Sequence, residues 1–462
     1  MAGLISVTMV SCEKFLEEKP YDFIGAANFY KTEGDANAAL NGVFSSLQPQ
    51  SYFGRTSWLV TELSGDLLRV NASLADRDNL YGQTFDANNG EIGNWWNNSY
   101  NLVNRANDVI KNVPNIQMDV ARRNNIVGNA TFLRAMGYFD LVRSFGSVPL
   151  TINPTTDLSS LKPSRTPIAA IYAQIIEDLR YAETNCVAEN LIPANAKGRV
   201  STGAASALLA KVYLTKATTS AKEATDYTNS LTASNKVINS SLYALGSYAD
   251  VFDVTKENNR DHIFSVQFDL SPNTGNIVVR MNLPAPAGTG SFVAENSFEA
   301  SFLPNDVRKA LTVRRETPSS VYPYYLKFAD PLRQGNNARN NVLITRYADV
   351  LLLQSEALNE ISAIDVNKLT GINAVRRRAS LPDLLLANVL TKDAFVDALV
   401  QERAWELSLE GHRRFDLLRL GRYKQRQLAV FNRTVADKYL LFPIPQTEID
   451  LNPNLLPQNP GF

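Results

Sequence analysis

The stretch QERAWELSLEGHRRFDLLRLGR, residues 401–422, gathers carboxylates, arginines and one of the two histidines in one short segment. Helical spacing places Glu402, Glu406 and Glu410 at i, i+4 and i+8, on one line where bare carboxylates repel one another. The line therefore requires cations, and guanidinium groups can bridge carboxylates through paired hydrogen bonds. The nearby candidates are Arg413, Arg414 and the run of Arg376 to Arg378 on the preceding predicted helix.

Three kinds of chemistry fit these residue types. Two of the glutamates could act as the acid and base of a glycosidase, and His412, Asp416 and Ser408 have the side chains of a nucleophile triad. A glycosidase acid needs a raised pKa, whereas surrounding arginines lower the pKa of a carboxyl group, and the triad lacks a strand-turn-helix setting. We favour the third interpretation, a structural ion-pair clasp, because charge clusters are more often structural than catalytic.

The composition is that of a folded globular protein without a dominant electrostatic partner. The 462 residues are 45% hydrophobic and 20% charged, and 46 basic side chains balance 46 acidic ones. No stretch is strongly basic, so we expect no nucleic-acid partner. Two cysteines and two histidines are too few for a zinc site of ordinary spacing, although a metal held by oxygens alone stays open. The sequence contains no run of about 18 apolar residues, which is the length that a membrane-spanning helix needs.

The N-terminal residues have the pattern of the end of a lipoprotein signal. An apolar run from Leu4 to Val10 precedes the small Ser11 and then Cys12. We expect residues 1–11 to be a signal peptide and Cys12 to be lipidated, although the segment has no basic residues before its apolar run. The alternative is an uncleaved N-terminus with a free Cys12 thiol. With Cys12 acylated, Cys186 has no disulfide partner and is expected to be a small buried hydrophobic residue.

Hydrophobic periodicity predicts a mostly helical chain, in which short strands and irregular segments appear from about residue 248. The predicted helices are residues 35–47, 91–113, 120–145, 167–185, 202–216, 222–239, 346–359, 366–379 and 391–409. HIFSVQFDL and NIVVRM have the composition of short strands, and residues 284–341 are rich in Pro, Gly, Asn and aromatic side chains. Residues 442–462 hold five prolines and are expected to wrap the surface.

Several segments together resemble one known family. ERAWELSLEGHRRFDLLRLGR, FLRAMGYFDLVRSFGSVPL, TRYADVLLLQSEALNE and LFPIPQTEIDLNPNLLPQNPGF are similar to motifs of the SusD/RagB family of outer-membrane nutrient-binding lipoproteins. CEKFLEEKPYDF, followed by NFYKTEGDANAALNGVF, resembles the mature N-terminus of that family. The likeness runs in order over nearly the whole chain, and the motifs are specific in combination.

The resemblance implies a mostly α fold of four tetratricopeptide-like helical hairpins with an irregular C-terminal layer that contains short strands. It divides the chain into a SusD-like N-terminal region, residues 12–247, and a C-terminal region, residues 248–462. It implies a protein that is not an enzyme and is tethered by lipid to the extracellular face of the outer membrane. We expect no cofactor and assign no metal-binding residues. The expected partners are an oligosaccharide and a TonB-dependent, SusC-like transporter; a peptide ligand or a secreted glycosidase is the alternative.

A glycan site needs exposed aromatic platforms beside amide, carboxylate or guanidinium groups. In GEIGNWWNNSYNLVNRAND, Trp96 begins a stripe that continues through Tyr100 and Val103. Trp95 is rotated by about 100° from this stripe, so we expect it to face outward with Asn98 and to bind ligand. The opposing interpretation is that Trp95 only covers another helix.

The remaining ligand candidates come from the resemblance and from aromatic content. By resemblance to the starch-binding member of the family, Asp66, Arg69 and Tyr81 are the nearest matches to its other ligand contacts. Phe292 in GTGSFV and the tyrosines of VYPYY are weaker aromatic candidates, and YPYYLKF is expected to pack structurally.

Overall fold

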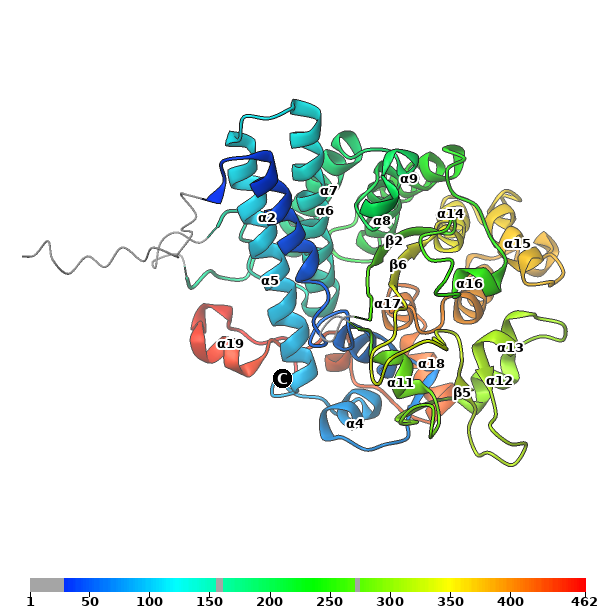
Figure 1. Cartoon of the computed structure of the whole chain (residues 1–462). Helices are drawn as coiled ribbons and strands as arrows, with labels where there is room; N and C mark the ends of the chain where they lie inside the picture. The colour runs from blue at the N-terminus through cyan, green and yellow to red at the C-terminus, as the bar shows by residue number, and fades with distance from the viewer. Residues whose placement is uncertain (1–28, 155–160, 271–274) are drawn as a thin grey trace, which may run out of the picture.

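The structure is a computed structural model in which residues 29–154, 161–270 and 275–462 are described. The predicted signal peptide and Cys12 lie outside the described residues. Within those ranges the fold is mostly helical, as predicted, and the strands form short two-stranded pairs (Figure 1). In the same ranges, no helix combines the length and the apolar character needed to span a membrane.

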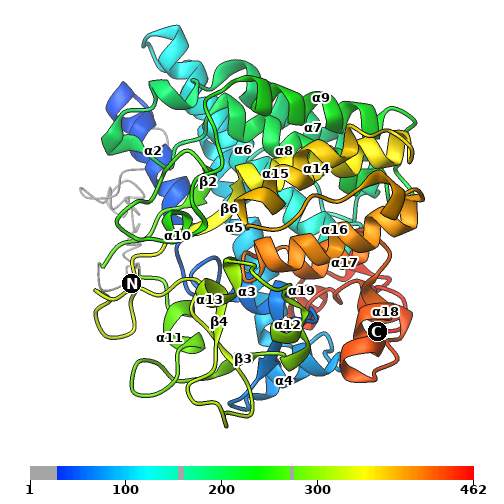
Figure 2. The ribbon, with the colours of Figure 1, turned by 90° about the vertical axis from the view of Figure 1, so that its right-hand side faces the viewer.

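Long helices pack side by side in pairs and form the bulk of the molecule (Figure 2). They are α2 (Glu33–Ser45), α5 (Gly90–Asn112), α6 (Val120–Phe145), α7 (Ile168–Asn185), α8 (Thr202–Lys216), α9 (Asp226–Asn239), α14 (Tyr347–Ile361), α15 (Lys368–Arg378) and α16 (Lys392–Leu407). Each of α6 to α9 packs against the next helix, and α14 then packs on α9. The C-terminal helices therefore extend the stack that the N-terminal helices begin.

Capping side chains and small residues explain where these helices begin and how closely they approach. Asp119 and Ser201 accept hydrogen bonds from the backbone N–H groups in the first turns of α6 and α8. Gly137 lies where α6 meets α5, and a Cβ atom there would come within 3.1 Å of the Val103 side chain. A methyl group at this position would therefore require its neighbours on α5 to shift, so a glycine suits this close approach of the two helices.

The short elements connect distant parts of the sequence. The strand pairs, all antiparallel, are β1 (Leu68–Val70) with β3 (Phe292–Ala294), β2 (His262–Val266) with β6 (Val342–Arg346), and β4 (Val313–Arg314) with β5 (Tyr324–Tyr325). The short helices are α3 (Thr56–Trp58), α4 (Ala75–Gly82), α10 (Tyr248–Val251), α11 (Val278–Asn282), α12 (Asn296–Ser301), α13 (Arg308–Thr312), α17 (Arg413–Arg419), α18 (Tyr423–Phe431) and α19 (Gln446–Leu451). A π-helical turn, η2 (Leu59–Leu63), continues α3.

Two local predictions are wrong. NIVVRM forms the helix α11 instead of a strand, because the Asn276 side chain accepts a hydrogen bond from the N–H of Val278 at 2.9 Å and starts a helical turn. The proline-rich C-terminus does not stay on the surface throughout. Phe442 is fully buried and its N–H donates to the carbonyl of Ser144 at 2.8 Å, so this segment docks onto the end of α6.

One large hydrophobic core unites residues from both halves of the chain. It includes Cys186, which is buried as predicted, and burial raises the pKa of its thiol to about 12. Most of YPYYLKF packs structurally as predicted, since Tyr325 is buried in the same core and its hydroxyl donates to the carbonyl of Leu67, whereas Tyr322 is only half-buried. The division of the chain at residues 247 and 248 stays a prediction.

Candidate functional site

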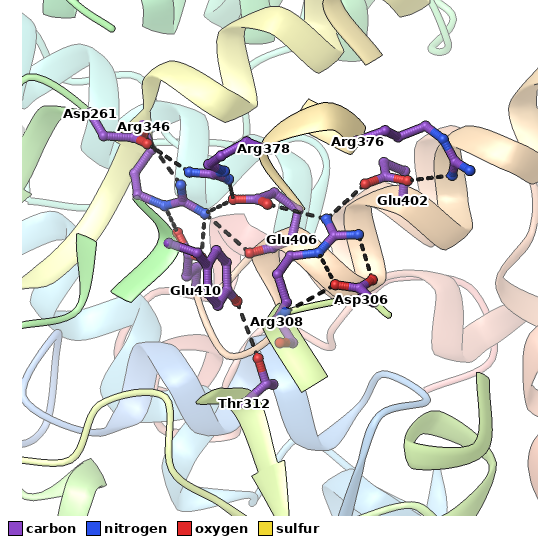
Figure 3. A network of polar contacts seen from close by, with 12 residues as sticks. Asp261, Asp306, Arg308, Thr312, Arg346, Arg376, Arg378, Glu402, Glu406 and Glu410 are labelled. Atoms are coloured by element: carbon purple, nitrogen blue, oxygen red, sulfur yellow. Dashed lines mark hydrogen bonds and ion pairs between the residues drawn. The ribbon is translucent and has the colours of Figure 1, made fainter. Parts of the chain in front are cut away.

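Glu402, Glu406 and Glu410 lie in a largely buried ion-pair network, which we call the clasp (Figure 3). Helix α16 ends at Leu407 instead of the predicted residue 409, so Glu410 lies in the turn that follows it. The five carboxylates and five cations of the clasp are Asp261, Asp306, Glu402, Glu406 and Glu410 with Arg308, Arg346, Arg376, Arg378 and Lys327. Glu406 occupies its centre, because its Oε1 lies 2.7 Å from Arg346 Nη2 and also contacts Arg378. Its Oε2 lies 3.2 Å from Arg308 Nη1. The predicted clasp is confirmed.

The electrostatics at Glu406 and Glu410 do not suit a general acid, whereas burial raises the pKa of Glu402 despite the opposing effect of Arg308. Burial raises the pKa of Glu406, but Arg378, Arg346 and Arg308 outweigh burial and hold that pKa well below its usual value. A carboxyl group in this setting stays ionised and cannot serve as a glycosidase acid at neutral pH. The three glutamates therefore join helices and loops through charge-assisted hydrogen bonds.

The triad-like residues are also engaged elsewhere. His412 Nδ1 faces Lys211 Nζ at 3.5 Å, and Asp416 Oδ2 accepts from Arg403 Nε at 2.7 Å. Burial, with Lys211 nearby, lowers the pKa of His412 to about 3, so the imidazole is neutral. Among the described residues, no hydrogen bond joins the His412 side chain to the side chain of Ser408 or of Asp416, so the arrangement of a nucleophile triad is not formed.

Two arginines of the segment pair differently from the expectation. Arg413 does not bridge Glu410 but binds Asp66, with Nε to Oδ1 at 2.5 Å. Arg414 Nη1 donates to the hydroxyl of Tyr423 at 2.8 Å, and its Nη2 donates to a backbone carbonyl. Arg346 and Lys327, which are distant in sequence, bind Glu410 instead.

Trp95 does not face outward, and this prediction is wrong. Its side chain is 1% exposed, compared with 3% for Trp96. The ring of Trp95 lies 5.2 Å from that of Tyr52 and 5.9 Å from that of Phe53, and its Nε1 donates to Ser144 Oγ at 3.0 Å. Helix α5 is covered on two sides, so both tryptophans belong to the core. A stacking role for Trp95 is not available in this structure.

Three other predicted ligand residues are held by the protein itself. Asp66 is fully buried and binds Arg413 and Arg426, which makes it a structural anchor. Phe292 on β3 is also fully buried, with its ring 5.1 Å from that of Trp58, so it is not an exposed platform. Asn98 is half-buried, and its amide donates to the carbonyl of Ser51 at 3.0 Å.

Arg69 and Tyr81 are brought together on a partly exposed surface, which we call the Arg69 surface. It consists of Arg69 on β1, Tyr81 on α4, Glu295 after β3, Tyr322 before β5 and Arg433 after α18. Arg69 Nε lies 2.9 Å from Glu295 Oε1, and the guanidinium carbon lies 4.8 Å from the centre of the Tyr322 ring and 5.7 Å from that of Tyr81. Strand alternation explains this placement, since Arg69 points to the face opposite the buried Leu68.

The chemistry of this surface suits hydroxyl-bearing ligands. Burial and the neighbouring Glu295 raise the pKa of Tyr81 to about 12, so its hydroxyl keeps its proton and can donate. That hydroxyl lies 3.3 Å from Glu295 Oε1, and Arg433 covers the Tyr81 ring at 5.3 Å. Two tyrosine rings, two guanidinium groups and one carboxylate therefore offer flat apolar faces together with donors and an acceptor.

Sequence reasoning missed Glu295 and Arg433, and it pointed to Tyr322 only as one of the tyrosines in VYPYY. The antiparallel pairing of Arg69 with Val293 brings Glu295 within reach, and no local pattern in the sequence signals that pairing. Within the described ranges, no group of three or more His, Cys, Asp or Glu side chains is arranged to hold a metal ion.

Comparison with family models gives two matches. The model described as the SusD family matches residues 307–462, and the model described as "Starch-binding associating with outer membrane" matches residues 14–214. Among curated relatives, the chain is 29% identical to SusD-like protein P2 of Formosa agariphila, with 99% of this chain and 98% of that protein covered. It is 27% identical to SusD-like protein P25 of the same organism, with coverage of 96% and 95%.

Solved structures agree with these matches. A SusD superfamily protein from Parabacteroides distasonis superposes with a TM-score of 0.82 at 27% identity, covering 93% of this chain and 99% of that one. A laminarin-binding SusD-like protein superposes with a TM-score of 0.81 at 24% identity, covering 94% and 100%, and this likeness concerns the fold alone. The fold and the matches define a helical protein of the SusD class. The chain belongs to the SusD/RagB family.

Proposed function

We propose that this protein binds oligosaccharides at the Arg69 surface and delivers them to a TonB-dependent, SusC-like transporter in the outer membrane. The observation that carries the proposal is the placement of two partly exposed tyrosine rings beside an ion-paired arginine on one surface. The family matches support the glycan class, because one of the two models is described as starch-binding and associated with the outer membrane. Lipidation of Cys12 would hold the protein at the extracellular face, and palmitate labelling that Cys12→Ala abolishes would support this anchor.

Each member of the Arg69 surface has a distinct role in this proposal. Tyr322 offers its ring face to the apolar face of a sugar. The Tyr81 hydroxyl already donates a hydrogen bond to Glu295, whereas the Tyr322 hydroxyl makes no such bond in the described structure. The Arg69 to Glu295 pair is fixed before ligand arrives, so little side-chain freedom is lost on binding. The function is binding without catalysis, which agrees with the ion-paired state of the clasp glutamates.

A glycan and peptide array on the chain lacking residues 1–12 would identify the ligand, with laminarin and starch fragments included. Titration calorimetry of Tyr322→Ala with that ligand should show a loss of about 2 kcal/mol, roughly thirtyfold in dissociation constant, as for an aromatic interface anchor. Tyr181→Ala is the matched control, because Tyr181 is 37% exposed on α7 and contributes to neither the Arg69 surface nor the clasp.

The outcomes separate the alternatives. Normal binding by Tyr322→Ala, or equal losses in Tyr322→Ala and Tyr181→Ala, would refute the site. Array hits with peptides alone would favour the peptide-binding branch of the family. Hydrolysis of an array glycan that Glu406→Gln abolishes would contradict the non-enzymatic function.

A further inference from the structure

A groove lies between helix α2, the loop at residues 195–199 and the end of β2. It shares no residue with the Arg69 surface. Its volume is about 400 Å³, which falls in the range of small-ligand sites, about 300 to 1,000 Å³. We call it the Arg199 groove. Its lining includes Asn41, Phe44, Gln48, Lys197, Arg199 and Gln267.

The Arg199 groove carries one positive charge that no carboxylate of the described residues neutralises. Lys197 is paired, with Nζ 2.6 Å from Glu189 Oε1, whereas no carboxylate among the described residues forms an ion pair with Arg199. The guanidinium group of Arg199 lies 4.7 Å from the centre of the Phe44 ring, and its Nη2 donates to the side-chain oxygen of Asn41. Nη1 is buried without a hydrogen-bond partner in the described structure.

Arg199 is half-buried and lacks a carboxylate partner among the described residues, whereas the buried Arg308 and Arg346 each pair with more than one carboxylate. An unpaired donor that has lost its water is unfavourable, and burial lowers the pKa of Arg199 without a nearby carboxylate to offset it. An anion in the groove would supply the missing partner. The planar fork of a guanidinium group matches a carboxylate in geometry as well as in charge.

The loop that carries Arg199 is held in place by a tight contact. Gly198 has a φ of +91°, and a Cβ atom there would come 2.4 Å from Gln267 Cγ. The Gln267 side chain is itself fixed by hydrogen bonds with Asn258 and Asn341. The groove is therefore organised before any ligand binds, which favours recognition of a small ligand.

We propose that the Arg199 groove binds the carboxylate group of an acidic sugar, with Arg199 as the anion partner. The side chains of Asn41, Ser45, Gln48 and Asn195 line the same groove and offer amide and hydroxyl groups to the sugar hydroxyls. The Arg199 groove is separate from the Arg69 surface. The anion site follows from the groove itself, and only the choice of a sugar as the ligand rests on the proposed glycan-binding function.

The test is a calorimetric titration of the purified protein with sodium glucuronate, glucose, sodium acetate and glucose 6-sulfate at constant ionic strength. Glucuronate should bind most tightly, because only it combines a carboxylate with sugar hydroxyls. Arg199→Gln should raise the glucuronate dissociation constant by about tenfold or more, as expected for a lost charge-assisted hydrogen bond. Arg199→Lys keeps the charge without the planar fork and should show an intermediate loss.

Arg122→Gln is the matched control. Arg122 on α6 is an exposed arginine that pairs with Glu33 on α2, the helix that also lines the Arg199 groove. This variant should bind glucuronate normally. Arg199→Gln should keep the wild-type affinity for a neutral glycan identified by the array, so that failure at one surface is distinguishable from failure at the other. The proposal is overturned if glucose or acetate binds as tightly as glucuronate, if glucose 6-sulfate binds more tightly, or if both Arg199 variants, folded by thermal melts, bind glucuronate like the wild type.

Discussion

Replacing Glu406 by Gln should destabilise the protein severely, because Glu406 is the central carboxylate of the clasp. The change keeps the shape of the side chain and removes one negative charge. Five cations would then face four carboxylates in a region that is almost completely shielded from water. Arg308, Arg346 and Arg378 would each lose a charged partner, and a buried charge without compensation is much more costly than an exposed one.

The expected magnitude follows from this burial. Removing one partner of a buried ion pair costs about 3 to 5 kcal/mol, whereas an exposed pair contributes about 0 to 1 kcal/mol. An unfolding entropy of about 2.1 cal/mol/K per residue over 462 residues gives about 1 kcal/mol/K, so a loss of 4 kcal/mol lowers the melting temperature by about 4 °C. Arg377→Gln is the control, since Arg377 pairs with Asp383 at the surface and its side chain is 63% exposed.

The assay is denaturant unfolding and thermal melting of both variants at pH 7 and pH 9. Burial lowers the pKa of Lys327 in the clasp to about 8 although Glu410 opposes this effect, so Lys327 can release its proton at pH 9. In Glu406→Gln that release restores the charge balance, and the loss of stability should be smaller at pH 9 than at pH 7. A loss no larger than that of Arg377→Gln, or a loss that grows at pH 9, would refute the reasoning.

Other expectations concern the core tryptophans and two buried carboxyl groups. Trp95→Ala and Trp96→Ala should each cost about 3 to 5 kcal/mol in denaturant unfolding, because both rings are buried; a neutral Trp95→Ala would contradict its core placement. Burial raises the pKa of Asp416, but the effects of Arg403 and Arg419 are larger and lower that pKa to about 2. The ionised Asp416 therefore stabilises the fold above about pH 4, and this contribution is lost as the pH falls towards 2. Asp416→Asn should therefore be less stable than the wild type at pH 6, with a smaller difference at pH 2 to 3; an unchanged difference would contradict the pairing. Burial raises the pKa of Glu62 to about 7, so its ionisation destabilises the fold as the pH rises from about 4.5 to 7, and Glu62→Gln should gain stability relative to the wild type between pH 5 and pH 8.

The helices could be predicted where local signals agree with the packing. Helices α6 and α8 match their predicted bounds residue for residue, because each begins at a capping side chain. Helix α9 begins at Asp226 instead of Lys222. The Asp226 carboxylate accepts the N–H of Glu223 and pairs with Lys216 Nζ at 2.8 Å, so the preceding residues form a turn. Only the folded structure brings Lys216 to that position.

The burial of Trp95 could also have been predicted from the sequence. Ser99, Leu102, Ala106 and Val109 follow Trp95 at helical spacing and are all buried, so α5 has a second apolar stripe beside the one that starts at Trp96. A helix with two such stripes packs against two partners.

The Arg69 surface could not be predicted in full, because its five residues come from five separate segments. Strand pairing and the docking of α18 bring them together, and neither has a local pattern. The clasp is different in this respect. Glu402 and Glu406 lie one turn apart on α16, and their need for cations follows from their repulsion. Glu410 lies in the turn after α16 ends, and the identity of Arg346 and Lys327 as its partners follows only from the fold.

The segment at residues 401–422 also connects the clasp with the Arg69 surface. The N–H of Gly411 donates to Glu62 Oε1 at 2.8 Å, and Arg413 binds Asp66, so two contacts hold the backbone that leads into β1. Arg69 lies three residues after Asp66 on that strand. These contacts fix the strand from which Arg69 reaches Glu295, and a rigid support of this kind keeps the Arg69 surface in a fixed geometry.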